Sequence, residues 1–199
     1  MGIKLDTSGS SSNVDWSWKL REAVDRIKNS YEHIGRSTGA PFLAIVYPPE
    51  CDAAVAKEWN ALTGMFGAEF NLVQIDILKI TMQVLQELGV ENVVETIQNP
   101  MPGSNPETEL ASMWLSAIVD EVKNNLPAPN SQKTIIVLEK LAALYPAAGP
   151  RSLMQALWDT KDLALDNPVV IFIPGRLIEP RVFEFLGKTR ELMYRGDIL

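Results

Sequence analysis

Four short runs along the chain are rich in apolar residues and show little alternation between apolar and polar positions. They cover residues 42–47, 71–77, 134–139 and 168–173. A strand with one face in water alternates, whereas a mostly apolar strand is typical of a sheet that is buried on both faces. The pattern therefore predicts four strands of a mainly parallel sheet.

Helical patterns lie between these runs. In residues 16–34, apolar positions recur at three- and four-residue steps, after Asp15 as an N-cap and before Gly35 as a helix end. The same reasoning predicts helices over residues 52–66, 78–88, 90–98, 106–126, 151–160 and 180–186. The last piece, 192–199, is expected to be extended.

The alternation of strands and helices specifies the fold class. Parallel neighbours need long crossover connections, and right-handed crossovers place helices on both faces of the sheet. We therefore expect a doubly wound α/β fold with a mainly parallel sheet of about four strands, resembling a degenerate P-loop or Rossmann-like scaffold. Residues 1–14 are expected to form a disordered tail and residues 15–199 a single domain.

Composition narrows the function classes without choosing one. The 199 residues contain one cysteine, Cys51, and one histidine, His33, which excludes an intrachain disulfide and a zinc site rich in either residue. No apolar run approaches the roughly 20 residues of a membrane span, so a cytoplasmic protein without a membrane partner is expected. The net charge of −7 disfavours nucleic acid as a partner of the chain by itself.

The turn after the first predicted strand argues against a nucleotide-dependent enzyme. A phosphate cradle needs glycine-rich backbone amides and usually a lysine. Residues 47–52 (YPPECD) offer two prolines, which lack an N–H donor, and two acids, which repel phosphate. Because His33 lies on a different predicted helix, Cys51 is expected to be a structural thiol. We expect neither a cofactor nor a catalytic residue.

An atypical nucleotide- and magnesium-binding site is the alternative that the sequence leaves open. The third predicted strand, TIIVLE, resembles the magnesium-binding strand of P-loop NTPases, with Glu139 at its end. Glu50, Asp52 and Asp76 follow other strand ends, and the carboxyl ends of parallel strands meet at one edge of a sheet. Asp76 and Glu139 are therefore the alternative metal ligands, in an ATPase or a switch.

Short motifs at the turns stand out above this general α/β pattern. In chain order they are Tyr47-Pro48-Pro49-Glu50, Tyr145-Pro146, Arg151 before a leucine-containing helix, Pro174-Gly175 and Tyr194-Arg195. Their order, with the chain length, resembles the BrxB family of bacterial BREX phage-defence systems, over roughly residues 40–60 and 133–199. One departure is that Glu139-Lys140 follows the third strand, where that family has a glycine-containing turn.

The resemblance implies a non-catalytic accessory of a multi-protein defence complex. Its implied partners are a PglZ-type protein of the alkaline-phosphatase superfamily and other BREX-like components. The partner-binding residues would be Tyr47, Pro48, Pro49, Tyr145, Arg151, Pro174, Gly175, Tyr194 and Arg195. A purely structural role is the alternative for these residues, because proline and glycine at strand ends also shape turns.

Overall fold

The computed structural model describes residues 16–126, 132–160, 163 and 165–199. The tail predicted for residues 1–14 and the predicted N-cap Asp15 lie outside these ranges. The residue that precedes the first helix is Trp16, which makes no side-chain capping hydrogen bond.

Helices and strands alternate as the sequence predicts. The α-helices of the described ranges are α1 (Ser17–Ser30), α2 (Asp52–Thr63), α3 (Ile77–Leu88), α4 (Val90–Gln98), α5 (Pro106–Asn124) and α6 (Pro150–Asp159). Short 3-10 helices are η1 (Tyr31–His33), η2 (Arg36–Thr38), η3 (Pro49–Cys51) and η4 (Leu141–Leu144). None of the helices in these ranges is both long enough and apolar enough to cross a membrane.

The strands form one sheet in the order β2-β3-β4-β1-β7, with β5 and β6 continuing from β4. The strands are β1 (Phe42–Tyr47), β2 (Phe70–Asp76), β3 (Lys133–Glu139), β4 (Val169–Glu179), β5 (Val182–Phe185), β6 (Thr189–Leu192) and β7 (Asp197–Ile198). Neighbours in the main order pair in parallel, whereas β4, β5 and β6 pair antiparallel. The predicted α/β fold with a mostly parallel sheet is confirmed.

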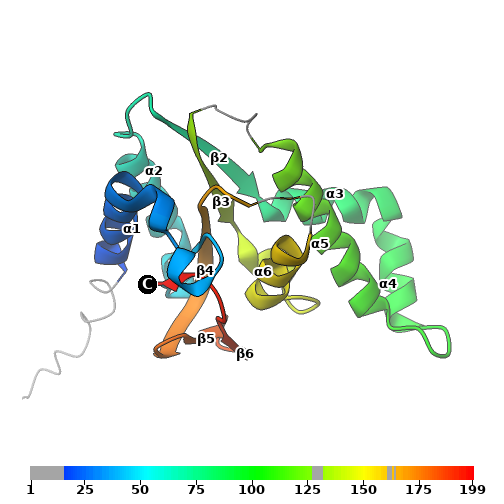
Figure 1. The fold of residues 1–199 in the computed structure, drawn as a ribbon. Helices are drawn as coiled ribbons and strands as arrows, with labels where there is room; N and C mark the ends of the chain where they lie inside the picture. The colour runs from blue at the N-terminus through cyan, green and yellow to red at the C-terminus, as the bar shows by residue number, and fades with distance from the viewer. Residues whose placement is uncertain (1–15, 127–131, 161–162, 164) are drawn as a thin grey trace, which may run out of the picture.

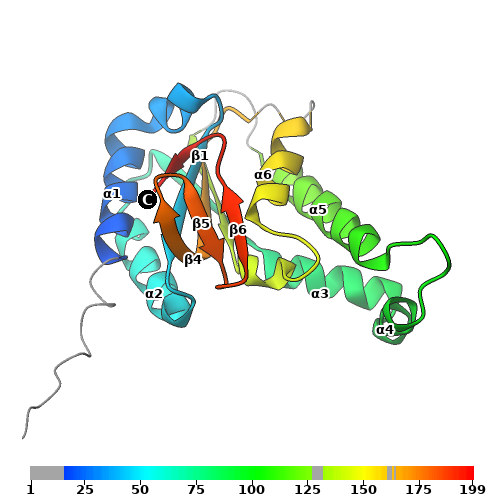
Figure 2. The same cartoon turned by 90° about the horizontal axis from the view of Figure 1, so that it is seen from below.

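Helices cover the sheet on both sides, and the side chains of β1, β3 and the parallel part of β4 divide between two cores. Figure 1 shows the ribbon, and Figure 2 shows α1 and α2 on one side of the strands and α3, α5 and α6 on the other. In β1, Phe42, Ala44 and Val46 pack in the core beneath α5 and α6. Leu43, Ile45 and Tyr47 pack in the core beneath α1 and α2. Burial on both faces explains why β1 and β3 are apolar without alternating. The edge strand β2, predicted to be buried in the same way, instead exposes Asn71 and Gln74.

The fourth strand does not end at Pro174-Gly175, as the sequence predicts, but runs on to Glu179. Pro174 is the last β4 residue in register with β1, opposite Tyr47, and Gly175 is the first in register with β5, opposite Phe185. The proline thus lies where β4 changes its partner strand, so its missing N–H donor does not interrupt a continuous ladder.

The predicted helix over residues 180–186 is wrong, because these residues enter a β-hairpin made of β5 and β6. Phe183 and Phe185 are fully buried with half-buried Glu184 between them, which is the two-residue period of a strand. Leu186 and Gly187 both have positive φ, as in the turns that join hairpin strands. A leucine in this conformation is uncommon, which hides the turn in the sequence.

The C-terminal segment, residues 193–199, returns to the sheet and is held there by hydrogen bonds. The Leu199 N–H donates to the Ala44 carbonyl, at 2.9 Å, on the β7 side of β1. From the hairpin, Arg181 donates to the carbonyl oxygens of Met193 and Gly196, at 2.9 and 3.1 Å. The path of this segment over the sheet is therefore fixed at both ends.

Gly175→Ala is expected to lower the free energy of unfolding by about 1–3 kcal/mol. A Cβ there would lie under 3.0 Å from the backbone carbonyl of Glu184, which cannot move without distorting β5. Gly67→Ala is the matched control, since its Cβ would meet nothing within 4 Å, and it is expected to change stability by no more than about 0.5 kcal/mol. Urea unfolding gives the free energy of unfolding of both variants. If both lost the same amount relative to the wild type, this explanation of Gly175 would be wrong.

Candidate functional site

At the carboxyl edge of the sheet, where the sequence places a ligand site, side chains from three elements bond to one another. The Tyr47 hydroxyl, at the end of β1, donates to Oδ1 of Asp52 on α2 at 2.6 Å. Lys140, after β3, places its Nζ 2.7 Å from Oδ2 of the same carboxylate. A small cavity of about 20 Å³ is left between them, which is room for about one water molecule.

These bonds keep Asp52 and Lys140 charged across neutral pH. Partial burial raises the pKa of the Asp52 carboxyl, but the hydrogen bonds from Lys140 and Tyr47 outweigh it and hold this pKa below its ordinary value. The bond to Asp52 raises the pKa of Lys140. Burial, and then the bond to Asp52, raise the pKa of Tyr47, so its hydroxyl stays a donor. Because both charged groups are more than a third exposed, the pair stabilises the fold by about 1 kcal/mol or less.

Lys140 has a left-handed backbone conformation, with φ 63° and ψ 36°. Glycine adopts this conformation readily, whereas a side chain at the position strains the backbone. The backbone after β3 therefore has the geometry of a glycine turn although the residue is a lysine. The ion pair with Asp52 explains why this position carries a lysine although its backbone conformation favours glycine.

Asp76 and Glu139, the alternative metal ligands, are engaged separately. Asp76 caps α3 by accepting the backbone N–H of Lys79 at 3.1 Å. Glu139 accepts from Gln74 at 3.4 Å, and burial raises its pKa, opposed by Lys140 and assisted by the charges of Asp76 and Asp52. Within the described ranges, no three histidine, cysteine, aspartate or glutamate residues are grouped so that they could hold a metal ion.

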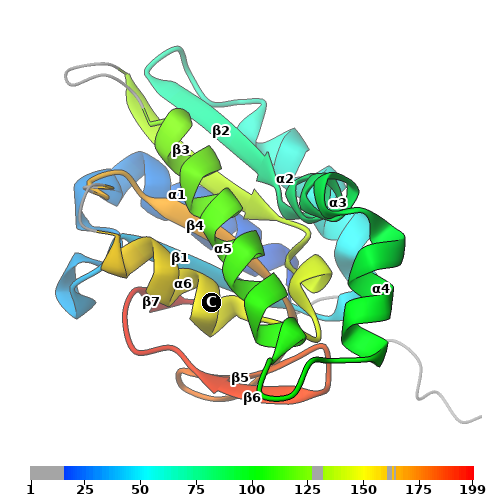
Figure 3. The ribbon, with the colours of Figure 1, turned by 90° about the vertical axis from the view of Figure 1, so that its right-hand side faces the viewer.

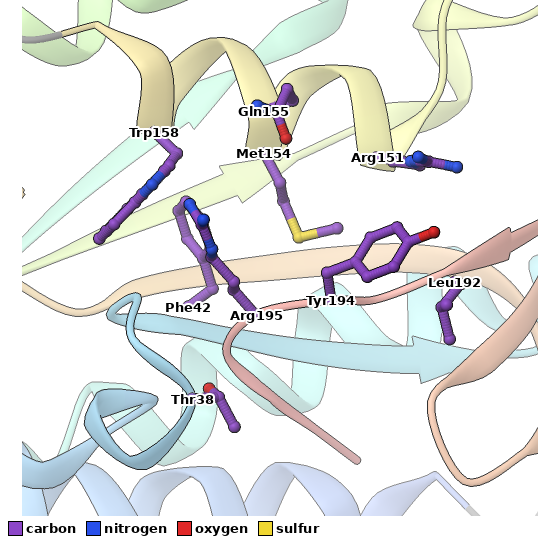
Figure 4. Close-up of a pocket in the computed structure, with 9 residues that line it drawn as sticks. All are labelled: Thr38, Phe42, Arg151, Met154, Gln155, Trp158, Leu192, Tyr194 and Arg195. Atoms are coloured by element: carbon purple, nitrogen blue, oxygen red, sulfur yellow. The ribbon is translucent and has the colours of Figure 1, made fainter.

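A larger hollow lies elsewhere, between α6 and the C-terminal segment, with a volume of about 430 Å³. We call it the C-terminal groove, and Figure 4 shows its lining. One wall comes from a single face of α6, because residues three, four and seven positions apart on a helix point the same way. The lining residues are Thr38, Phe42, Arg151, Met154, Gln155, Trp158, Leu192, Tyr194 and Arg195.

Two arginine–aromatic pairs bridge the groove in opposite directions. The Arg151 guanidinium of α6 lies over the Tyr194 ring of the C-terminal segment, 4.8 Å from its centroid. The Arg195 guanidinium of that segment lies over the Trp158 ring of α6, also at 4.8 Å. Among the described residues, no carboxylate lies within ion-pair distance of either guanidinium, and no side-chain acceptor bonds to it. Both groups therefore present unused N–H donors.

Glu191 of β6 fixes one end of this groove. Its Oε2 accepts the backbone N–H of Arg151 at 2.7 Å, in the first turn of α6. Gly149 permits this approach, since a Cβ there would lie under 3.0 Å from the Glu191 carboxylate. Burial raises the pKa of Glu191, opposed by the Arg151 bond and charge. The contact ties the strand before the C-terminal segment to the start of α6.

The residues singled out from the sequence fall at two places. Arg151, Tyr194 and Arg195 meet in the C-terminal groove, although 43 positions separate the first two. The others lie away from the groove lining. Tyr47 ends β1, Pro48 and Pro49 follow it, Tyr145 follows η4, and Pro174 and Gly175 lie within β4. Pro49 and Pro174 line a hollow of about 460 Å³, whereas close backbone packing explains Gly175. Tyr145, 40% exposed, precedes a cis bond to Pro146.

Trp158 is the main groove residue that sequence reasoning misses. It lies seven positions after Arg151 and therefore on the same helix face, which is the one signal that could have found it. Gln155 and Met154 share that face. Thr38 and Phe42 line the groove because the C-terminal segment returns to the sheet beside them. No local sequence pattern predicts that return.

No protein-family model, no curated protein and no solved structure matches this chain.

Lys140→Ala is expected to destabilise the protein by about 1 kcal/mol more than Lys140→Gly. Both variants lose the ion pair with Asp52, so their difference reports the left-handed backbone alone. Chemical unfolding of the two variants side by side provides the measurement. An alanine variant as stable as the glycine variant would contradict the backbone argument.

Glu191→Gln is expected to gain stability relative to the wild type as the pH rises from about 4.5. Burial holds the pKa of Glu191 in the folded protein above its ordinary value of 4.5. In that window the folded wild type binds more protons than its unfolded form, so its stability falls with rising pH. Glutamine does not titrate, so the variant lacks this loss of stability with rising pH. Its side-chain oxygen can still accept the Arg151 N–H. The measurement is the free energy of unfolding of both proteins from pH 4 to 8. If the variant instead lost stability relative to the wild type as the pH rises, the prediction would be wrong.

Proposed function

We propose that this chain is a non-catalytic binding component of a multi-protein assembly, and that the C-terminal groove receives an acidic segment of a partner protein. The observation that carries the proposal is the pair of guanidinium groups of Arg151 and Arg195. Each is held over an aromatic ring, and neither has a carboxylate within ion-pair distance in the described part of the chain.

Stacking on a ring prepares an arginine for recognition. The ring holds the plane of the guanidinium, and the N–H donors on its edge remain available for two parallel hydrogen bonds to a carboxylate. Because the plane is fixed in advance, little side-chain entropy is lost when the ligand binds. The half-exposed rings of Trp158 and Tyr194 add apolar surface beside each charge. An acidic segment with flanking apolar residues matches this lining.

The partner that we propose is a PglZ-type protein of a BREX-like defence system, in the cytoplasm. Support comes from the BrxB-like motif residues Arg151, Tyr194 and Arg195, which are distant in the sequence and adjacent in the groove. This identity rests on the resemblance and on the chemistry of the groove. The chemistry would also suit an acidic segment on another component of such an assembly.

The double variant Arg151→Ala/Arg195→Ala is expected to weaken binding to the PglZ-type partner at least about 30-fold. Removing both charge-assisted contacts costs about 2 kcal/mol or more, and 1.4 kcal/mol corresponds to a tenfold change in Kd. Isothermal titration with the purified partner gives Kd for both proteins. Wild-type binding is also expected to weaken as salt is raised from 50 to 300 mM, because exposed charges are screened.

Arg190→Ala is the matched control, since Arg190 is an exposed arginine of β6 outside the groove lining. Its Kd is expected to stay within about twofold of the wild type. A double variant that binds normally would overturn the groove proposal. The nucleotide alternative would be supported instead by a thermal shift with ATP and Mg²⁺ that Asp76→Asn/Glu139→Gln abolishes.

A further inference from the structure

The helices α3, α4 and α5, here called the helical arm (residues 77–124), expose an unusual amount of apolar surface. Eight of the fifteen large exposed apolar side chains in the described part of the chain lie in this arm. Their exposed fractions range from 37% to 73%. They are Leu78, Met82, Leu88, Val90, Val94, Ile97, Met101 and Met113. Exposed apolar side chains that are concentrated in one region often mark an interaction site, whereas single exposed ones are ordinary.

Helix α4 has an apolar face and leaves most of it exposed. Val90, Val93, Val94 and Ile97 follow the spacing of one helix face, which normally packs on a core. Val93 is half-buried, and the other residues of α4 are exposed. Figure 3 shows α4 at the outer edge of the molecule beside α5, away from the sheet. Apart from Val93, which packs against the core, this face is therefore left uncovered by the described residues.

A groove of about 160 Å³ runs between α4 and α5. Its apolar lining comes mainly from Leu88, Val93, Ile97, Leu110 and Met113. A groove between two helices receives the ridge of a third helix in ordinary helix packing. The residues of such a ridge would be apolar and spaced at three and four positions.

Most charged side chains of the helical arm are acidic, and its two lysines, Lys79 and Lys123, lie near its ends. Between Ile80 and Val122 the sequence contains no lysine or arginine. The acids in the same stretch are Glu87, Glu91, Glu95, Glu107, Glu109, Asp120 and Glu121. Glu109 lines the groove, and Glu91 and Glu95 are exposed on α4 beside its apolar face. A ligand that carries lysine or arginine could pair these residues with the acids, which form an acidic rim, while its apolar side chains lie in the groove.

We propose that the helical arm binds a basic amphipathic helix of a partner protein. The apolar face of that helix would lie in the α4–α5 groove, and its lysine or arginine residues would face the acidic rim. A second copy of the chain is the poorer occupant, because two arms placed face to face would set one acidic rim against another. This surface is separate from the C-terminal groove and opposite to it in charge, so it would hold a different segment.

The test uses a fluorescent synthetic 18-residue helical peptide of leucine and lysine, with leucine at three- and four-residue spacing. Anisotropy of this probe with the full chain gives Kd. Val94→Gln/Ile97→Gln and Glu91→Lys/Glu95→Lys are each expected to weaken binding about tenfold or more, through lost apolar burial and lost charge complementarity. A peptide of the same composition in scrambled order, which has no apolar face, is expected to bind at least tenfold more weakly.

The control variants are Met65→Gln and Glu69→Lys, which alter an exposed methionine and an exposed acid outside the arm. Both are expected to bind the probe as the wild type does. Equal weakening by control and arm variants would overturn the proposal, as would equal binding of the scrambled peptide. A wild-type dimer that Val94→Gln/Ile97→Gln converts to a monomer would also overturn it, since a second copy would then be the occupant. Circular dichroism verifies that each variant is folded.

Discussion

The return of the C-terminal segment to the sheet is the constraint on which the C-terminal groove depends. Met193 is buried, and Gly196 passes so close to Phe42 that a Cβ there would lie under 3.0 Å from it. Between these two anchors, Tyr194 and Arg195 are left to project over α6, where Figure 4 shows them facing Arg151 and Trp158. Backbone hydrogen bonds, which do not depend on the exposed rings, thus position both arginine–aromatic pairs. The groove is formed before any ligand arrives, which lowers the entropic cost of binding.

Two surfaces of opposite character lie on the same side of the sheet (Figure 2). The C-terminal groove offers unpaired arginine donors between α6 and the C-terminal segment, while the helical arm offers acids around an apolar groove. Since the two core clusters fill both faces of the sheet, neither surface moves easily relative to the other. A rigid body with two sites of opposite charge is suited to joining two different segments, and like-charged segments would be rejected at each.

The sequence allows the central strands to be predicted because a strand that is buried twice must be apolar throughout, as in Phe42–Tyr47. The hairpin escapes prediction because its turn places Leu186 at φ 53°, a conformation that sequence preferences assign to glycine or asparagine. Arg151 and Arg195 are singled out by resemblance to a family. Their stacking partners follow from long-range packing, since nothing local to Trp158 indicates that residue 195 lies over its ring.

The most direct test of the central claim is fluorine NMR of the chain labelled with fluorotryptophan, during titration with the PglZ-type partner. The chain has five tryptophans, so each can be assigned by substitution. Trp158 lines the C-terminal groove, whereas Trp59 and Trp114 are buried in separate cores. The account predicts that the Trp158 signal shifts or broadens on binding while those of Trp59 and Trp114 stay in place. Saturated binding that leaves the Trp158 signal unchanged would contradict it.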